Sequence, residues 1–274
     1  MMHSTRRRLR HLAGLGGLLL ALGAGLPAVQ AVQAEEQVQT QAQLTLGDAW
    51  LAWQQAYPGV VPWQHAVALR HDTASTLDRE RRFLANTLAT LGVSARVAGD
   101  ARRAAGLQAW QATLAAWDPA ASRTPGRFDL PWLGAHRRDN PPLASLVHYG
   151  VCEPPAWVEV WSLDGVRRLA WSAAQNLDEL LAALSPQAAR DADWAAVVAP
   201  DGRISRRGVA AWNHQPTPLV PGSRVLLELP GERGLRAASP FPGTRGEREL
   251  VNDRLPALLA TRLPGDACPL TRTP

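Results

Sequence analysis

Residues 195–230, AAVVAPDGRISRRGVAAWNHQPTPLVPGSRVLLELP, alternate between apolar runs and turn sequences. The runs 195–199 and 225–229 have the small and branched apolar side chains typical of buried strands. Pro200-Asp201-Gly202 and Pro221-Gly222 separate them, because proline, aspartate and glycine favour turns. The stretch therefore predicts short strands joined by tight turns.

The segment before this stretch predicts a hairpin and a helix. Residues 157–163 and 166–171 flank Asp164-Gly165, a favoured hairpin turn. Asn176 and Glu179 form a capping box for a helix over 177–184, which Ser185-Pro186 ends. The order hairpin–helix–strands is typical of a β-grasp unit, and a generic α+β sandwich is the alternative that the pattern leaves open.

The first half of the chain predicts mainly helices. We expect a short helix over 44–57, a strand over 66–70 and helices over 75–91 and 100–117. Ser75 or Thr76 would cap the third of these elements and Gly92 would end it. Residues 126–150 contain Pro131, Pro141 and Pro142, which predict an extended segment.

Several motifs, taken in order, resemble the capsule biosynthesis GfcC family. They are Thr124-Pro125-Gly126-Arg127, Asn140-Pro141-Pro142-Leu143, the hairpin at 157–165, PDGR at 200–203, AAWN at 210–213, PGSRVLLEL at 221–229 and the amphipathic segment 250–262. The resemblance implies an α+β fold with two tandem β-grasp-like domains. These would be residues 35–153, with a helical insertion at about 75–118, and residues 154–231, followed by an amphipathic helix at 244–263. Two departures are Val147-His148-Tyr149-Gly150, where the family has Gly-Asp, and the tail 264–274.

Residues 1–34 have the three parts of a secretory signal. Four arginines precede an apolar core at 12–26, and two A-V-Q-A runs place the cut after Ala31 or Ala34. The core is shorter than the roughly 20 apolar residues that span a bilayer, so a retained anchor is the disfavoured alternative. We therefore expect a periplasmic protein without a membrane span in the mature chain.

Removing this segment changes the charge of the chain. All basic residues are arginine, and four of the 29 lie in the signal, which leaves 25 against 24 acidic residues. The mature chain is thus almost neutral, and we expect no nucleic-acid partner because such proteins present a basic surface. The absence of lysine also excludes a Walker lysine and a Schiff-base lysine.

Motifs for catalysis or metal binding do not stand out. Beyond the signal there are five histidines, without an HExxH motif, and the chain has neither a G-x-S-x-G elbow nor a Gly-rich phosphate loop. We therefore expect no catalytic residues, no metal and no cofactor. A pair of carboxylates for glycoside hydrolysis stays open, because any two at about 5–10 Å would serve.

Three residues are candidates for ligand binding. Arg127 ends the glycine–arginine motif, and a guanidinium binds carboxylates such as those of uronic acids through two hydrogen bonds. Trp212 and Asn213 stand in a turn-rich segment, where an indole can stack on a sugar ring. A structural role is the alternative for all three. Cys152 and Cys268 could form a disulfide if their Cα atoms approach within about 7 Å.

The resemblance implies a non-catalytic periplasmic protein of capsule or exopolysaccharide assembly or export. Its partner would be an acidic polysaccharide or an outer-membrane polysaccharide exporter. A polysaccharide-modifying hydrolase and an adaptor that binds only protein are the alternatives. The apolar stripe of the C-terminal helix, which Pro256 is expected to kink or restart, would either dock on its own domain or form an interface.

Overall fold

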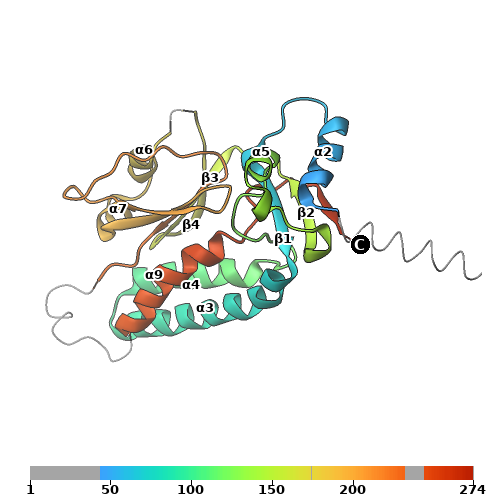
Figure 1. Ribbon diagram of the computed structural model, residues 1–274. Helices are drawn as coiled ribbons and strands as arrows, with labels where there is room; N and C mark the ends of the chain where they lie inside the picture. Colours follow the sequence, from blue (N-terminus) through green and yellow to red (C-terminus); the bar gives the residue numbers. More distant parts are fainter. Residues whose placement is uncertain (1–43, 174, 232–243, 274) are drawn as a thin grey trace, which may run out of the picture. The chain divides into compact units, whose positions relative to one another are not determined.

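The computed structural model describes residues 44–173, 175–231 and 244–273, so the signal at 1–34 and its cut sites lie outside the described residues. In these ranges the protein is α+β, with seven α-helices and two sheets (Figure 1). None of the described helices is long and apolar enough to cross a bilayer. The helices are α2 (Leu46–Ala56), α3 (His71–Val97), α4 (Ala101–Ala116), α5 (Leu130–Ala135), α6 (Leu177–Ala182), α7 (Pro186–Asp191) and α9 (Thr244–Leu259).

The larger sheet has five strands in the order β4-β3-β7-β5-β6. Its central pair, β3 and β7, is parallel, and the other neighbours are antiparallel. The expected hairpin is present as β3–β4, and Asn176 caps α6 by accepting a hydrogen bond from the backbone N–H of Glu179 at 2.9 Å. The strands are β3 (Trp157–Ser162), β4 (Gly165–Ala170), β5 (Trp194–Val198), β6 (Ile204–Gly208) and β7 (Arg224–Leu227).

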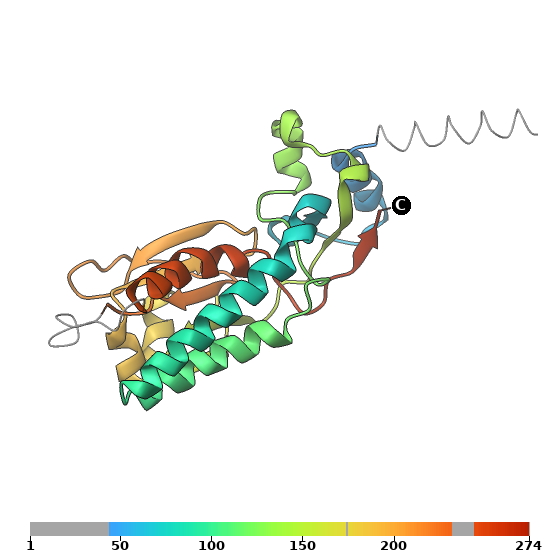
Figure 2. The ribbon, with the colours of Figure 1, turned by 90° about the horizontal axis from the view of Figure 1, so that it is seen from below.

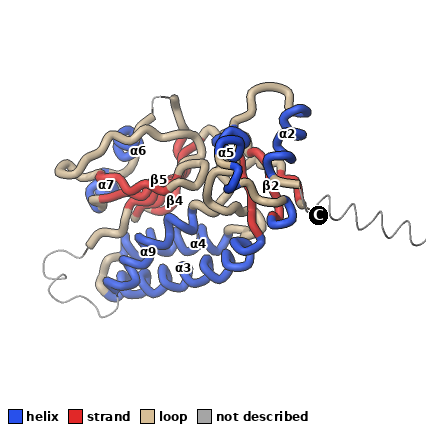
Figure 3. Tube along the Cα trace, viewed as in Figure 1, coloured by secondary structure: helices blue, strands red, loops and turns tan. Residues whose placement is uncertain are grey.

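Helices cover both faces of this sheet (Figures 1 and 3). Because side chains alternate along a strand, Val158 and Val160 of β3 pack against α6 and α7, whereas Trp161 packs against α4. Trp110 of α4 meets the ring of Trp161 edge to face, and its indole N–H donates to the Ser162 carbonyl at 2.7 Å. The helix pair expected as an insertion of the first domain thus shares a core with the second half.

The smaller sheet has the order β1-β2-β8 and is antiparallel. Trp50 of α2 packs against strands β1 (Ala66–Arg70) and β2 (Leu146–Val151). The third strand, β8 (Leu270–Arg272), comes from the tail that looked like an addition. The described residues from 44 onwards belong to one compact unit, and the two tandem domains stay a prediction.

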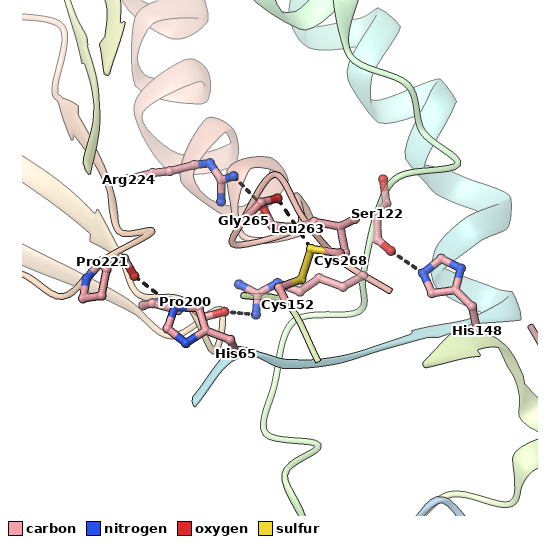
Figure 4. Close-up of a disulfide and its surroundings, with 11 residues drawn as sticks. His65, Ser122, His148, Cys152, Pro200, Pro221, Arg224, Leu263, Gly265 and Cys268 are labelled. Atoms are coloured by element: carbon pink, nitrogen blue, oxygen red, sulfur yellow. Dashed lines mark hydrogen bonds between the residues drawn. A yellow bond between two sulfur atoms is a disulfide. The ribbon is translucent and has the colours of Figure 1, made fainter. Parts of the chain in front are cut away.

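Cys152 and Cys268 form a disulfide that holds this tail (Figure 4). Their Cα atoms are 4.0 Å apart and 116 positions apart in the sequence. Next to the bond, the backbone N–H of Glu153 donates to the Ala267 carbonyl at 2.9 Å. On the other side, Asp266 accepts from the indole N–H of Trp157 at 2.8 Å and from Arg168 at 2.9 Å. The tail therefore connects the small sheet to β3 and β4.

Helix α9 places its apolar stripe inside the chain. Val251, Leu255 and Leu259 are fully buried in the core that α3 and α4 form. Figures 1 and 2 show α9 lying beside α3. The helix is assigned without interruption through Pro256, so the expected restart does not occur. The stripe docks on its own chain, which was the first of the two alternatives.

Two local expectations for α3 were wrong, and the one for the end of α6 was incomplete. Helix α3 begins at His71 instead of 75, and it continues through Gly92. Gly92 faces α4, where a Cβ would be in ordinary contact with Leu107. It ends before Gly99, whose φ of 75° is the left-handed conformation typical of a helix terminus. Ser185-Pro186 begins α7 instead of merely ending α6, because the Ser185 hydroxyl accepts from the Ala188 N–H.

The segment 126–150 is likewise not simply extended. It contains α5, in which Asp129 is the N-cap and Pro131 occupies the first turn, where its missing N–H costs nothing. The segment ends in strand β2. Pro131 thus lies at the start of a helix. Composition alone does not distinguish a proline that starts a helix from one that breaks it.

Two glycines in the α3–α4 pair give a matched stability test. A Cβ at Gly106 of α4 would lie 2.4 Å from the Leu163 carbonyl oxygen, whereas one at Gly92 of α3 would meet its nearest atom at 3.9 Å. We expect Gly106→Ala to lower the free energy of unfolding by about 1–3 kcal/mol, since backbone must move. Gly92→Ala should raise it by up to about 1 kcal/mol, because alanine favours helix. Urea unfolding of both variants checks this, and equal effects would contradict the close packing of α4 on the β3–β4 turn.

Candidate functional site: a groove between the large sheet and helix α9

A groove of about 510 Å³ lies between one end of the large sheet and α9. Strand β5 contributes Trp194 next to Asp193, β6 contributes Arg206, and Glu228 follows β7. The wall from α9 and the segment before it consists of Leu229, Pro230, Gly231, Arg248, Glu249, Asn252 and Asp253. The groove thus combines one indole with a majority of polar and charged groups.

Trp194 of the groove lining contacts a second tryptophan, Trp212, which is not itself a lining residue. The guanidinium of Arg206 lies over the ring of Trp194, 4.2 Å from its centroid. The ring of Trp212 meets Trp194 edge to face, with centroids 6.1 Å apart and an interplanar angle of 84°. Trp212 is 72 % exposed, so most of its indole surface faces solvent. Burying such a surface stabilises a complex, which makes an exposed indole a natural contact for an apolar ligand face.

Asn213 fixes the turn that presents Trp212. Its amide oxygen accepts from the Ala210 N–H at 3.0 Å, and its amide nitrogen donates to the Asp193 carbonyl at 2.8 Å. Gly208 is required opposite, since a Cβ there would lie 1.9 Å from the Asn213 carbonyl oxygen. Asn213 therefore positions Trp212 beside the groove, and its own amide is used within the turn.

The charged groups of the groove are arranged in pairs. Arg206 binds Glu228 through two hydrogen bonds of 2.6 and 2.7 Å. Arg248 lies 3.3 Å from Glu249, whose pKa is lowered mainly by the hydrogen bond from Arg245. The lining contains four carboxylates and two guanidinium groups, which gives it an excess of negative charge.

The Asn252 side chain ties α9 to the end of β7. Its oxygen accepts from the Leu229 N–H at 2.8 Å, and its nitrogen donates to the Leu229 carbonyl at 3.1 Å. These two bonds satisfy the backbone where the strand leaves the sheet. The floor of the groove is consequently held by side chains that are already paired.

Arg127 lies elsewhere, at the start of α5. Its Nε and Nη2 donate to the two oxygens of Asp129 at 2.9 Å each, and its Cζ is 4.6 Å from the Trp132 ring centroid. Asp129 also caps α5 by accepting from the Trp132 N–H at 2.9 Å. The described contacts do not join Arg127 to Trp212 or Asn213. Nη1 is the guanidinium nitrogen outside the pair with Asp129.

Two of the motifs on which the resemblance rests are in contact. The backbone N–H of Gly126 donates to the Asp201 carbonyl at 3.2 Å, so TPGR touches PDGR. Arg123, which is buried, donates to the carbonyls of Ala260 at 3.0 Å and Pro200. Burial lowers the pKa of Arg123 to about 10, so it stays charged at neutral pH. These motifs form a structural junction between the small sheet, the large sheet and the end of α9.

The second half of this junction is a buried carboxylate surrounded by arginines. Oε1 of Glu159 lies 2.7 Å from Arg262 Nη1 and 3.4 Å from Arg224 Nε, and Oε2 lies 3.4 Å from Arg168. Glu159 and Arg224 are almost fully buried, and burial lowers the pKa of Arg224 to about 9. The Arg224 Nη2 also donates to the Leu263 carbonyl (Figure 4). Because each charge has an opposite partner or a carbonyl, the cluster is built for stability.

Two buried histidines bond backbone through Nε2, while Nδ1 of His65 is buried without a hydrogen-bond partner. Nε2 of His65 donates to the Pro221 carbonyl at 3.2 Å, and that of His148 to the Ser122 carbonyl at 2.8 Å (Figure 4). Burial lowers the pKa of both. Within the described ranges, no three His, Cys, Asp or Glu side chains gather as a metal site would require.

Sequence reasoning selected Trp212 and Asn213 and missed Trp194, Arg206 and Glu228. Trp194 lies on β5, Arg206 on β6 and Glu228 directly after β7, so their meeting depends on the order β7-β5-β6. Trp194 lies opposite Gly208 and Arg206 opposite Ala196, so the two side chains are diagonal neighbours on β5 and β6. Their shared face follows only once the register is known.

The comparisons with known proteins concern the second half of the chain. Residues 166–264 match the family model described as capsule biosynthesis GfcC C-terminal. A search of curated proteins gives no match. The matched stretch includes the groove strands β5, β6 and β7 and helix α9, while Arg127 and the small sheet fall outside it. The match over residues 166–264 agrees with the resemblance to the capsule biosynthesis GfcC family that the sequence motifs indicate.

Proposed function

We propose that the protein is a non-catalytic periplasmic component of capsule or exopolysaccharide assembly and that it binds polysaccharide during export. The observation that carries this proposal is the match of residues 166–264 to the GfcC C-terminal family, which suggests a role in capsule assembly. The signal at 1–34, with its cut after Ala31 or Ala34, supports the compartment. An outer-membrane polysaccharide exporter is the protein partner that such a role would require.

The described carboxyl groups whose pKa is clearly shifted do not show the raised pKa of a glycosidase acid. A glycosidase needs one carboxyl group whose pKa is raised, so that it can act as an acid near neutral pH. Among the described residues, every carboxyl group with a clear pKa shift is shifted downwards: Asp48, Asp78, Glu159, Asp164, Glu249 and Asp266. In the groove, Glu228 is held by two hydrogen bonds from Arg206.

The topology of the large sheet supports a β-grasp assignment for residues 154–231. Numbered from β3, its strands follow the order 2-1-5-3-4 around a parallel central pair, with helices after the first hairpin. We extend the proposal to residues 35–153 as a second such unit only through the family resemblance. The small sheet supplies β1 and β2, and its third strand comes from the tail.

Arg127, Trp212 and Asn213 remain the proposed ligand contacts, with unequal support. Trp212 is exposed beside a groove, and Asn213 fixes its position. Nε and Nη2 of Arg127 donate to Asp129, and the third guanidinium nitrogen, Nη1, could donate to a ligand. The adaptor alternative through the apolar stripe of α9 is weakened, because that stripe is buried in the chain.

A deletion experiment tests the proposed function. Removing the gene from the bacterium that carries it should lower the surface polysaccharide, and the intact gene should restore it. Normal surface polysaccharide in the deletion strain would contradict the proposal. The hydrolase alternative is tested separately by incubating purified polysaccharide with the protein, where shortened chains on size-exclusion chromatography would favour catalysis.

A further inference from the structure

We propose that the groove between the large sheet and α9 binds a saccharide segment that carries no carboxylate, with Trp212 as the stacking surface. This inference rests on the proposed polysaccharide-binding function and names the ligand class of the groove. It departs from the acidic polysaccharide that the sequence suggests as a partner. Three observations carry it: the exposed indole, the pairing of the arginines and the charge of the lining.

The exposed indole supplies the apolar contact. Sugar rings have one face made of C–H groups, which packs against a flat aromatic surface. Trp212 is 72 % exposed, and its ring meets Trp194, a residue of the groove lining, edge to face. The bonds of Asn213 hold the turn, so little side-chain or loop entropy is lost when a ligand covers the ring.

The arginines are not available to a carboxylate. Recognition of a uronic acid requires a guanidinium fork whose two donors point at the ligand. In Arg206 the Nε and Nη2 donors are used by both oxygens of Glu228, and its planar face lies on Trp194. Arg248 donates to the Pro230 carbonyl and contacts Glu249.

The charge of the groove acts in the same direction. Among its described lining residues, four carboxylates stand against two guanidinium groups, so the groove disfavours a negatively charged ligand. Carboxylates have several lone pairs, so Glu228 can accept further hydrogen bonds from hydroxyl groups while it holds Arg206. A ligand rich in hydroxyls and free of carboxylate fits both requirements.

A glycan array tests this ligand class with the purified full-length mature protein. The probes are neutral hexose and N-acetylhexosamine oligosaccharides, together with oligosaccharides of galacturonic and glucuronic acid at matched length. We expect binding to members of the neutral set and none to the uronic acids at the same concentration. Binding confined to the uronic acids, or to no probe, would overturn the proposal.

Two variants locate the binding on the protein. Trp212→Ala should weaken the affinity for the bound neutral probes about tenfold or more, while thermal unfolding stays near that of the original protein. The matched control is Tyr57→Ala, which removes a partly exposed aromatic ring that stacks on Trp53 of the α2 region. Binding that survives Trp212→Ala, or that falls equally in Tyr57→Ala, would contradict this groove as the site.

The outcome is distinguishable from a failure of the proposed function. If the deletion strain has normal capsule but neutral glycans bind through Trp212, the groove is confirmed and its cellular role is different. If capsule is lost on deletion but the array shows only uronic acid binding, the role stands and the ligand class proposed here is wrong.

Discussion

Replacement of Glu159 by glutamine is expected to lower the free energy of unfolding by about 3–5 kcal/mol, the range for breaking a buried ion pair. The glutamine keeps the size of the side chain but removes the negative charge. Arg224, which is almost fully buried, and Arg262 would then repel each other without a compensating carboxylate. Urea unfolding followed by tryptophan fluorescence measures the loss.

The matched control for this variant is Asp78→Asn. Asp78 also contacts two arginines, Arg81 at 2.6 Å and Arg82 at 2.9 Å, but its side chain is 45 % exposed. An exposed pair contributes about 0–1 kcal/mol, so the control should change little. Similar effects in the two variants would mean that the junction is not held by the buried carboxylate.

Glu159 also predicts how stability depends on pH. Burial raises the pKa of Glu159, but Arg224 and Arg262 outweigh burial and hold the pKa below its ordinary value of 4.5. A carboxyl group with a lowered folded pKa contributes stability that is fully present above its unfolded pKa and is lost as the pH falls through the folded one. We expect the stability lost between pH 5 and the acid limit to be smaller in Glu159→Gln than in the original protein. Parallel pH profiles would contradict this assignment.

Removal of the disulfide is expected to cost about 2–5 kcal/mol, because it closes a long loop in the unfolded chain. Cys152 and Cys268 are 116 positions apart, which makes the loop-closure entropy large. The test is the double variant Cys152→Ala/Cys268→Ala, compared with the original protein with and without dithiothreitol. The reductant should destabilise the original protein and leave the double variant unchanged.

A shortened chain separates the cross-link from the strand that it holds. Deleting residues 270–274 removes β8 and the hydrogen bond from the Thr273 N–H to the Val147 carbonyl, but it keeps the disulfide and the contacts of Asp266. We expect this deletion to cost less than the loss of the two cysteines. An equal or larger loss would show that β8, and not the cross-link, holds the tail.

Four strands of the large sheet, all except β6, were predictable because their signals are local. Asp164-Gly165 fixes one hairpin, Asn176 caps α6, and the apolar runs at 195–199 and 225–229 mark two inner strands. The small sheet was not, since β8 is a three-residue strand with an exposed and polar pattern that no local rule distinguishes from a tail. Its pairing depends on a cross-link and on long-range contacts.

The candidate site was predictable only in part for a related reason. Trp212 stands out because a tryptophan in a turn-rich segment has few local partners. Arg206 and Glu228 are 22 positions apart and meet because β7 and β6 both flank β5. Arg127 and Asp129, by contrast, are only two positions apart, so their ion pair could have been predicted from the sequence.

Binding of the purified protein to the capsular polysaccharide of its own bacterium tests the central claim most directly. Affinity electrophoresis in gels with and without that polysaccharide gives the answer, because a binding protein is retarded in the first gel only. We predict retardation of the original protein and of Tyr57→Ala, and a mobility close to that in the empty gel for Trp212→Ala. Equal mobility of the original protein in both gels would contradict polysaccharide binding.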